Sequence, residues 1–236
     1  MGAPTIVATA ADPNANSYVT VAQATAYAAT SLHEEDWTDA SEDLRAKALI
    51  AATRAIESQP LRGSRFDVTT PQRLHYPTVE SAWQRAHEET FTAALDTAVQ
   101  LSRTRLQADS ALVYDAEGTE YTADEDYEVD AEAGTITALS GGALSDGEDY
   151  LIDYSYLGPP RQVEDATCEQ ALYIIRQTNT PELLDHRELQ RQGLRTFAMD
   201  GISASYGGAT SELCERAQVL LSAYVGFAAK IAGRGA

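Results

Sequence analysis

The stretch YLIDYSYLGPP, at residues 150–160, marks the point where the predicted structure changes from strands to helices. Tyr150, Ile152, Tyr154 and Tyr156 recur at every second position, which is typical of a β-strand. The two prolines that follow end the strand, because proline has no backbone N–H to donate to a ladder. Apolar residues at helical spacing then predict a helix over residues 163–178.

The region before this stretch, from about residue 89, carries strand signals separated by short turns. Tyr127 and Val129 alternate with acidic residues, and Asp146-Gly147 is typical of a tight turn. The other predicted strands cover residues 91–94, 98–102, 111–115 and 135–139. Strands this closely spaced predict a small antiparallel β-sandwich.

Helical signals precede the strands. Thr20 with Gln23 fits a capping box, which predicts a helix to about Ser31. A loop over residues 33–40 and a second helix, capped by Ser41 and running to about Ser58, are expected next. The apolar face of this second helix should comprise Leu44, Ala48, Ala51, Ala52, Ala55 and Ile56. The chain should then be irregular over residues 60–77, with Trp83 in a short helical turn.

Further helical signals follow the predicted helix at residues 163–178. Thr180-Pro181-Glu182 is a good start for a short helix, because proline suits the first turn. Asp200-Gly201 predicts the turn of a hairpin, and Ser211 should open a last helix. The expected fold class is therefore α+β: a discontinuous helical domain (1–85 and 159–236), an inserted β-sandwich (86–158) and a short hairpin before the last helix.

Sites of catalysis, metal binding and cofactor binding are not evident in the sequence. It lacks a phosphate-binding loop and a dinucleotide fingerprint, and residues 201–205 lack the second glycine of a nucleophile elbow. The four histidines are widely spaced, and the acidic cluster from Asp124 to Glu132 fails as a calcium loop, because Val129 stands where glycine is required. A hydrated strand face accounts better for these acids. Cys168 and Cys214 are expected to be small buried hydrophobic residues. We therefore predict no enzyme, no metal and no cofactor.

The sequence also shows no membrane-spanning segment and no export signal. No apolar run approaches the length that spans a bilayer, and residues 1–15 lack the basic start and apolar stretch of a signal peptide. The protein is therefore expected to be made in a cytoplasm and to have no membrane partner.

Several segments in combination carry a resemblance to a known family. They are Asn16-Ser17-Tyr18-Val19-Thr20-Val21-Ala22-Gln23-Ala24, Lys47-Ala48-Leu49-Ile50-Ala51-Ala52-Thr53-Arg54, Gln72-Arg73-Leu74-His75-Tyr76-Pro77, Cys168-Glu169-Gln170-Ala171-Leu172-Tyr173, Gln192-Gly193-Leu194-Arg195-Thr196-Phe197 and Leu213-Cys214-Glu215-Arg216-Ala217. With these, the chain resembles the head–tail connector (adaptor) family of tailed bacteriophages, often labelled DnaT-like single-stranded-DNA-binding proteins. The predicted insert resembles a module common in phage structural proteins, which the basic family lacks.

The resemblance implies a virion structural protein of a tailed virus (Caudoviricetes), located in the neck and assembled in the host cytoplasm. Members of the family form a ring, typically of twelve subunits, on the portal protein and offer a surface to the next neck or tail-completion protein. The ring extends the DNA channel without binding DNA specifically, and it catalyses nothing.

The net charge of −19 fits such a conduit, since acidic walls repel phosphates. Lys47 and Lys230 are the only lysines among seventeen basic residues. Acidic, lysine-poor chains suit a high-salt cytoplasm, where self-repulsion is screened, so we hypothesise a halophilic host. An actinobacterial virus with an acidic, GC-rich coding bias is the alternative.

Candidate contact residues lie near the C-terminus. Phe227, Lys230, Ile231 and Arg234 form a mildly basic, partly apolar tip that could dock on the portal, or they could be a frayed terminus. The candidates for a ring contact, or for contact with the next neck protein, are Arg195, Phe197, Asp200 and Tyr206 in the hairpin of residues 193–206. The exposed sides of the second and last helices are further candidates for the ring interface.

Two other functions remain open from the sequence. Single-stranded-DNA binding requires a basic groove lined with aromatic residues, for which Arg187, Arg191 and Arg195 are the local cluster. A glycan-binding or adhesion module would rest on the strand region alone, with the tyrosines at 150, 154 and 156 as its binding strip. Core packing of these tyrosines is the alternative.

Overall fold

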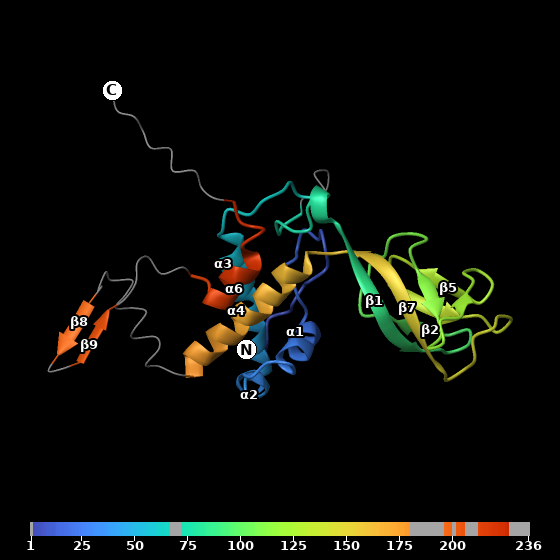
Figure 1. Ribbon diagram of the computed structural model, residues 1–236, viewed down its shortest axis with the longest axis horizontal. Coiled ribbons are helices and arrows are strands. Elements are labelled where there is room, and N and C mark those ends of the chain that lie inside the picture. Colours follow the sequence, from blue (N-terminus) through green and yellow to red (C-terminus); the bar gives the residue numbers. More distant parts are fainter. Residues whose placement is uncertain (1, 67–71, 180–195, 200–201, 206–211, 227–236) are drawn as a thin grey trace, which may run out of the picture.

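A computed structural model of the chain describes residues 2–66, 72–179, 196–199, 202–205 and 212–226. Over these residues the protein is mixed α and β with antiparallel sheets, as the sequence predicts. Figure 1 shows the helices gathered at the centre and the strands β1 to β7 together on one side of them.

The helices of the described chain are α1 (Val21–Ala28), α2 (Glu34–Thr38), α3 (Glu42–Glu57), α4 (Arg161–Asn179) and α6 (Glu215–Leu221). The predicted capping box is present: the Thr20 hydroxyl accepts from the Gln23 N–H, and the Gln23 side chain accepts from the Thr20 N–H. Ser41 caps α3 as expected, by accepting from the Leu44 N–H. Local hydrogen bonding thus fixes where both helices begin.

Other predictions for the helices were wrong. The expected loop at residues 33–40 contains α2, whose Trp37 is buried and donates its indole N–H to the Thr25 hydroxyl at 3.0 Å. On α3, Ala51 is exposed, whereas Leu49 and Thr53 are buried. The buried face is rotated from the predicted one because α3 packs chiefly against α4, whose position the local pattern does not give.

The last helix begins at Glu215, with Cys214 at its N-cap, and not at Ser211 as predicted. The helix predicted from Thr180 lies outside the described residues. The predicted hairpin is confirmed, since β8 (Thr196–Met199) pairs antiparallel with β9 (Ile202–Ser205) and brings Met199 opposite Ile202.

Two antiparallel sheets form the strand region. Its strands are β1 (Trp83–Thr92), β2 (Ala98–Gln100), β3 (Leu112–Tyr114), β4 (Glu120–Tyr121), β5 (Tyr127–Asp130), β6 (Thr135–Ala138) and β7 (Asp149–Leu157). One sheet has the order β1-β7-β3-β4 and the other β2-β6-β5. Trp83 begins β1, opposite Leu157, and does not lie in a helical turn; that turn is the 3₁₀ helix Val79–Ser81.

Both sheets contribute to one hydrophobic core. Phe91, Val113 and Ile152 come from the first sheet, and Tyr127 and Ile136 come from the second. Alternate residues of β5 face outward, so Glu128 and Asp130 are exposed on an edge strand, where charge discourages pairing with other chains.

The tyrosines of β7 belong to this core. Tyr150, Tyr154 and Tyr156 are 7%, 1% and 6% exposed. They cannot form the exposed strip that a glycan-binding surface would use, and the core-packing alternative is the right one.

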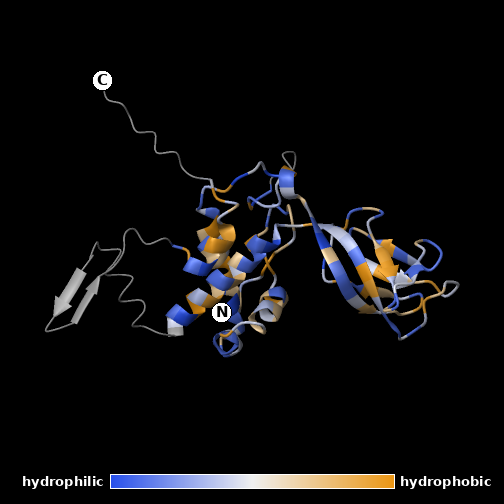
Figure 2. Ribbon diagram, viewed as in Figure 1, coloured by the Kyte–Doolittle hydropathy of each residue, from blue (hydrophilic) through white to orange (hydrophobic). Residues whose placement is uncertain are grey.

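The helices enclose two further clusters of buried side chains. Figure 2 shows hydrophobic residues, in orange, alternating with hydrophilic ones along these helices. One cluster joins α1, α2, α3 and α4, with Leu49 and Ile175 fully buried within it. The other joins Tyr18, Ile56 and Tyr76 to α4 and α6. Cys168 and Cys214 are buried among these residues, as predicted.

Candidate assembly surfaces

The joint between the strands and the helices is held by an ion pair. Arg103, which follows β2, donates two hydrogen bonds to the Glu164 carboxylate on α4, at 2.6 and 2.8 Å. The Glu164 side chain is 8% exposed, and the Arg103 guanidinium lies 4.6 Å from the ring centroid of Tyr156. Planar, bidentate pairing of this kind fixes orientation as well as distance.

Burial shapes the electrostatics of this pair. It raises the pKa of the Glu164 carboxyl, and the neighbouring guanidinium offsets only part of that effect. Burial also opposes the charge of Arg103, but its hydrogen bonds to Glu164 and the attraction of that carboxylate leave the pKa of the guanidinium raised. Each of the two side chains therefore depends on its partner to stay ionised in this buried position.

Backbone contacts complete the joint. Arg105 donates a side-chain hydrogen bond to the Ala10 carbonyl oxygen, and its own carbonyl accepts from the Leu157 N–H at 2.9 Å. The Gly158 N–H donates to the Ala82 carbonyl oxygen at 3.0 Å. The bonds to Ala10 and Ala82 link the strand region to residues of the helical portion, and the bond between Arg105 and Leu157 holds the end of β7 beside the segment that bears Arg103.

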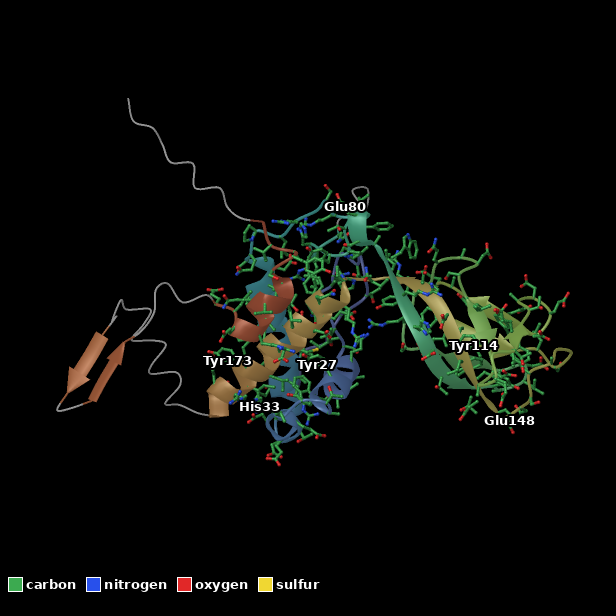
Figure 3. All side chains as sticks on the ribbon, viewed as in Figure 1. Tyr27, His33, Glu80, Tyr114, Glu148 and Tyr173 are labelled. Carbon is green, nitrogen blue, oxygen red and sulfur yellow. The ribbon has the colours of Figure 1, made fainter. Side chains whose placement is uncertain are left out.

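A groove of about 640 Å³ lies on the helical portion. The turn after α1, the outer side of α4 and the start of α6 line it, with Leu32 fully exposed at its edge. Figure 3 labels Tyr27, His33 and Tyr173, which come from these elements and gather around this region.

The rim of the groove is polar and its charges are paired. The Tyr27 hydroxyl donates to the Glu169 carboxylate at 2.7 Å, and Arg216 approaches the same carboxylate at 3.9 Å. Arg176 lies 3.4 Å from the Asp36 carboxylate. Burial, and then the hydrogen bond to Glu169, raise the pKa of Tyr27 well above its usual value. An exposed leucine beside a groove lined by both apolar and charged side chains is suited to a protein contact.

The contact residues predicted from the sequence fall almost wholly outside the described chain. Phe227, Lys230, Ile231 and Arg234 lie beyond its last described residue. Of the hairpin candidates, Phe197 is in β8 and pairs with Ala204. The remaining three, Arg195, Asp200 and Tyr206, also lie outside the described residues.

Neither the joint nor the groove could be predicted from the sequence. Arg103 and Glu164 are 61 positions apart, and no local pattern connects them. The only signal at Leu32 was an apolar residue in a segment expected to be a loop. Among the described residues, no group of three or more histidines, cysteines or carboxylates could hold a metal ion. No described helix combines the length and apolar character needed to cross a membrane.

Comparison with protein families matches residues 4–130 to the family described as "Putative DnaT-like ssDNA binding protein". The chain belongs to this family. The matched residues take in α1 to α3 and β1 to β5, so the likeness to this DnaT-like family extends into the strand region. No curated protein matches the chain.

Among solved structures, the "Neck of empty GTA particle computed with C6 symmetry" is similar to this chain at 17% identity. The match covers 89% of this chain and 92% of that one, with a TM-score of 0.24.

Proposed function

We propose that this protein is a structural head–tail adaptor of a tailed virus. In this role it forms a ring beneath the portal, extends the DNA channel and links the portal to the next neck or tail-completion protein. It catalyses no reaction and uses no cofactor.

The main support for the proposal is that the segments that resemble the adaptor family fold together into one helical body. The Tyr18 hydroxyl donates to the Glu57 carboxylate and accepts from the Tyr76 N–H at 3.3 Å, while the His75 N–H donates to Glu57 at 3.0 Å. The segments from Cys168 and from Leu213 supply buried residues to the same clusters. Five segments that are distant in the chain thus build one body, and the family match covers the first three of them.

The proposed domain arrangement is a helical adaptor domain (1–85 and 159–236) with an inserted β-sandwich (86–158). It is supported by the separation of the hydrophobic clusters, because the cluster between the two sheets contains only residues from 86 to 156. Residues 106–160 also hold fourteen acidic residues and no lysine or arginine. Such a module would present a hydrated surface on the outside of the neck and would bind nucleic acid poorly.

In a closed ring, one face of each subunit meets a different face of its neighbour. We propose that the groove edged by Leu32 and the outer side of α6, where Val219 is 62% exposed, belong to these faces. The basic tip of Phe227, Lys230, Ile231 and Arg234 would contact the portal, and the hairpin of residues 193–206 would contact a neighbour or the next protein. Twelve copies are expected.

Single-stranded-DNA binding is the second candidate, favoured by the description of the family. Within the described chain, seven of the twelve basic side chains lie within 4 Å of a carboxylate: Lys47, Arg85, Arg103, Arg105, Arg161, Arg176 and Arg216. The other five include Arg62, Arg65 and Arg73, which form no ion pair with another described residue. A strand-binding groove needs cations free to meet phosphates, together with aromatic faces on which bases can stack.

Electron microscopy of the purified protein mixed with the portal ring of the same virus tests the adaptor role. We expect a second ring attached to one end of the portal, and its loss in a variant lacking residues 227–236. Oligonucleotide binding at moderate salt is measured in parallel. A protein that remains monomeric beside the portal but binds single strands tightly would refute the adaptor role and favour the second candidate.

A further inference from the structure

Three arginines gather at the end of the helical body where β1 begins. Arg62, Arg65 and Arg73 are exposed, and none of them forms an ion pair with another described residue. The His75 Nε2 donates to the Arg62 carbonyl oxygen at 2.8 Å, and Arg65 donates to the Arg73 carbonyl oxygen at 3.4 Å. These contacts bring the backbone at the three arginine positions into one region of a protein whose net charge is −19.

Two exposed apolar side chains adjoin these cations. Trp83 is 45% exposed and packs edge-on against Phe66, with ring centroids 6.4 Å apart. Val79 is 61% exposed, and its N–H donates to the Ser64 carbonyl oxygen at 2.9 Å. We call the set of Arg62, Arg65, Arg73, Val79 and Trp83 the arginine–tryptophan surface. Tryptophan and arginine together are typical of the residues that contribute most to protein–protein binding.

Two described acidic residues, Glu80 and Glu57, lie beside this surface. Glu80, labelled in Figure 3, accepts a hydrogen bond from the Ser64 backbone N–H, and backbone donors of this kind lower the pKa of its carboxyl. Glu57 accepts from Tyr18 and from the His75 N–H. The three arginines therefore outnumber the two carboxylates among the described residues of this region.

The same chain carries a surface of opposite charge. Residues 106–160 hold fourteen acidic residues and no cation. Eleven of these acids are exposed: Asp109, Glu117, Glu120, Asp124, Glu125, Glu128, Asp130, Glu132, Asp146, Glu148 and Asp149. Four of them lie in strands β4, β5 and β7 and the rest in the connecting turns and loops. In Figure 1 these strands lie to one side of the helices, away from the start of β1.

We propose that the arginine–tryptophan surface of one subunit docks on the acidic strand region of a second copy. This inference rests on the proposed ring, in which two different faces must meet. Two copies that each carry a charge of −19 repel one another in most orientations, and pairing these surfaces makes one orientation attractive. Trp83 and Val79 then lose water at the contact, which adds apolar burial to the electrostatic steering.

Charge reversal on either side tests the contact. In Arg62→Glu/Arg65→Glu, we expect the self-association constant, measured by analytical ultracentrifugation across a salt series, to fall about ten-fold or more. Glu120→Lys/Glu128→Lys should weaken association similarly, because it reverses charge on the acidic side of the contact. Both side chains are exposed, so the fold should be kept. An equimolar mixture of the two variants should recover association, since each then offers one surface of reversed charge to the other.

Arg161→Glu is the matched control. Arg161 is exposed and lies in the first turn of α4, where an acidic residue is favoured, so self-association should stay within about two-fold of the original. Association that is unchanged in both double variants would overturn the contact, as would mixing that fails to restore it. The contact would also be refuted if Arg62→Glu/Arg65→Glu lost oligonucleotide binding while its self-association stayed unchanged, because the surface would then bind nucleic acid.

The same variants separate this contact from the adaptor role. If Arg62→Glu/Arg65→Glu still forms a complete ring on the portal, the contact is refuted while the adaptor role stands. If the unaltered protein forms no ring with the portal, the adaptor role fails as well.

Discussion

The pair formed by Arg103 and Glu164 gives the sharpest test of how the strand region is joined to the helices. Arg103→Ala removes both hydrogen bonds, at 2.6 and 2.8 Å, and leaves a carboxylate that is 8% exposed without its partner. Removing one partner of a buried pair costs about 3–5 kcal/mol of unfolding free energy. Because the Arg103 side chain is 23% exposed, and water can enter the gap, we expect a value near the lower limit, about 3 kcal/mol.

For a chain of this size, a loss of about 3 kcal/mol lowers the melting temperature by roughly 6–12 °C. The assay is urea unfolding at fixed high salt, followed by circular dichroism and by tryptophan fluorescence. Glu164→Gln should cost less, about 1–2 kcal/mol, because the amide oxygen still accepts one hydrogen bond. Its combination with Arg103→Ala should cost clearly less than the sum of the single changes.

The control is the pair of Arg161 and Asp165, which also lies at the start of α4 but has an arginine side chain 86% exposed and a separation of 3.9 Å. Arg161→Ala should cost no more than about 0.5 kcal/mol. Equal effects of Arg103→Ala and Arg161→Ala, or a coupling between Arg103 and Glu164 below about 0.5 kcal/mol, would refute the reasoning.

Three other predictions follow from the buried groups and from the composition. Burial raises the pKa of Tyr156 to about 12, whereas a tyrosine in the unfolded chain has a pKa of about 10. The neutral Tyr156 side chain therefore makes its full contribution to stability below about pH 10, and this contribution is lost as pH rises toward 12. Unfolding free energy should therefore fall over this range, and the slope should be shallower in Tyr156→Phe; an unchanged slope would contradict the assignment. Burial raises the pKa of the Cys168 thiol, so iodoacetamide should label it at least about a hundred-fold more slowly in the folded protein than in urea, and fast labelling of the folded protein would contradict its burial. If the host is halophilic, circular dichroism should find the protein partly unfolded at low ionic strength and stabilised by molar salt, because salt screens a net charge of −19; complete folding without salt would favour the alternative host.

The sequence by itself determined the elements whose causes are local. The Thr20 and Ser41 caps accept hydrogen bonds from residues three positions away, so both helix starts could be read directly. Asp200-Gly201 likewise predicted the turn that brings Met199 opposite Ile202. Alternation in β5 and β7 predicted which side chains are buried, because a strand places every second residue on the same face.

Tertiary structure alone decided the features that depend on distant partners. The segment containing Trp37 became a helix because its indole packs into a core built by three other helices. β1 extends back to Trp83 because β7 supplies a partner as far as Leu157. The joint of Arg103 with Glu164 exists only once the strands and α4 have met, since the energy of that pair comes from burial and geometry and not from either local sequence.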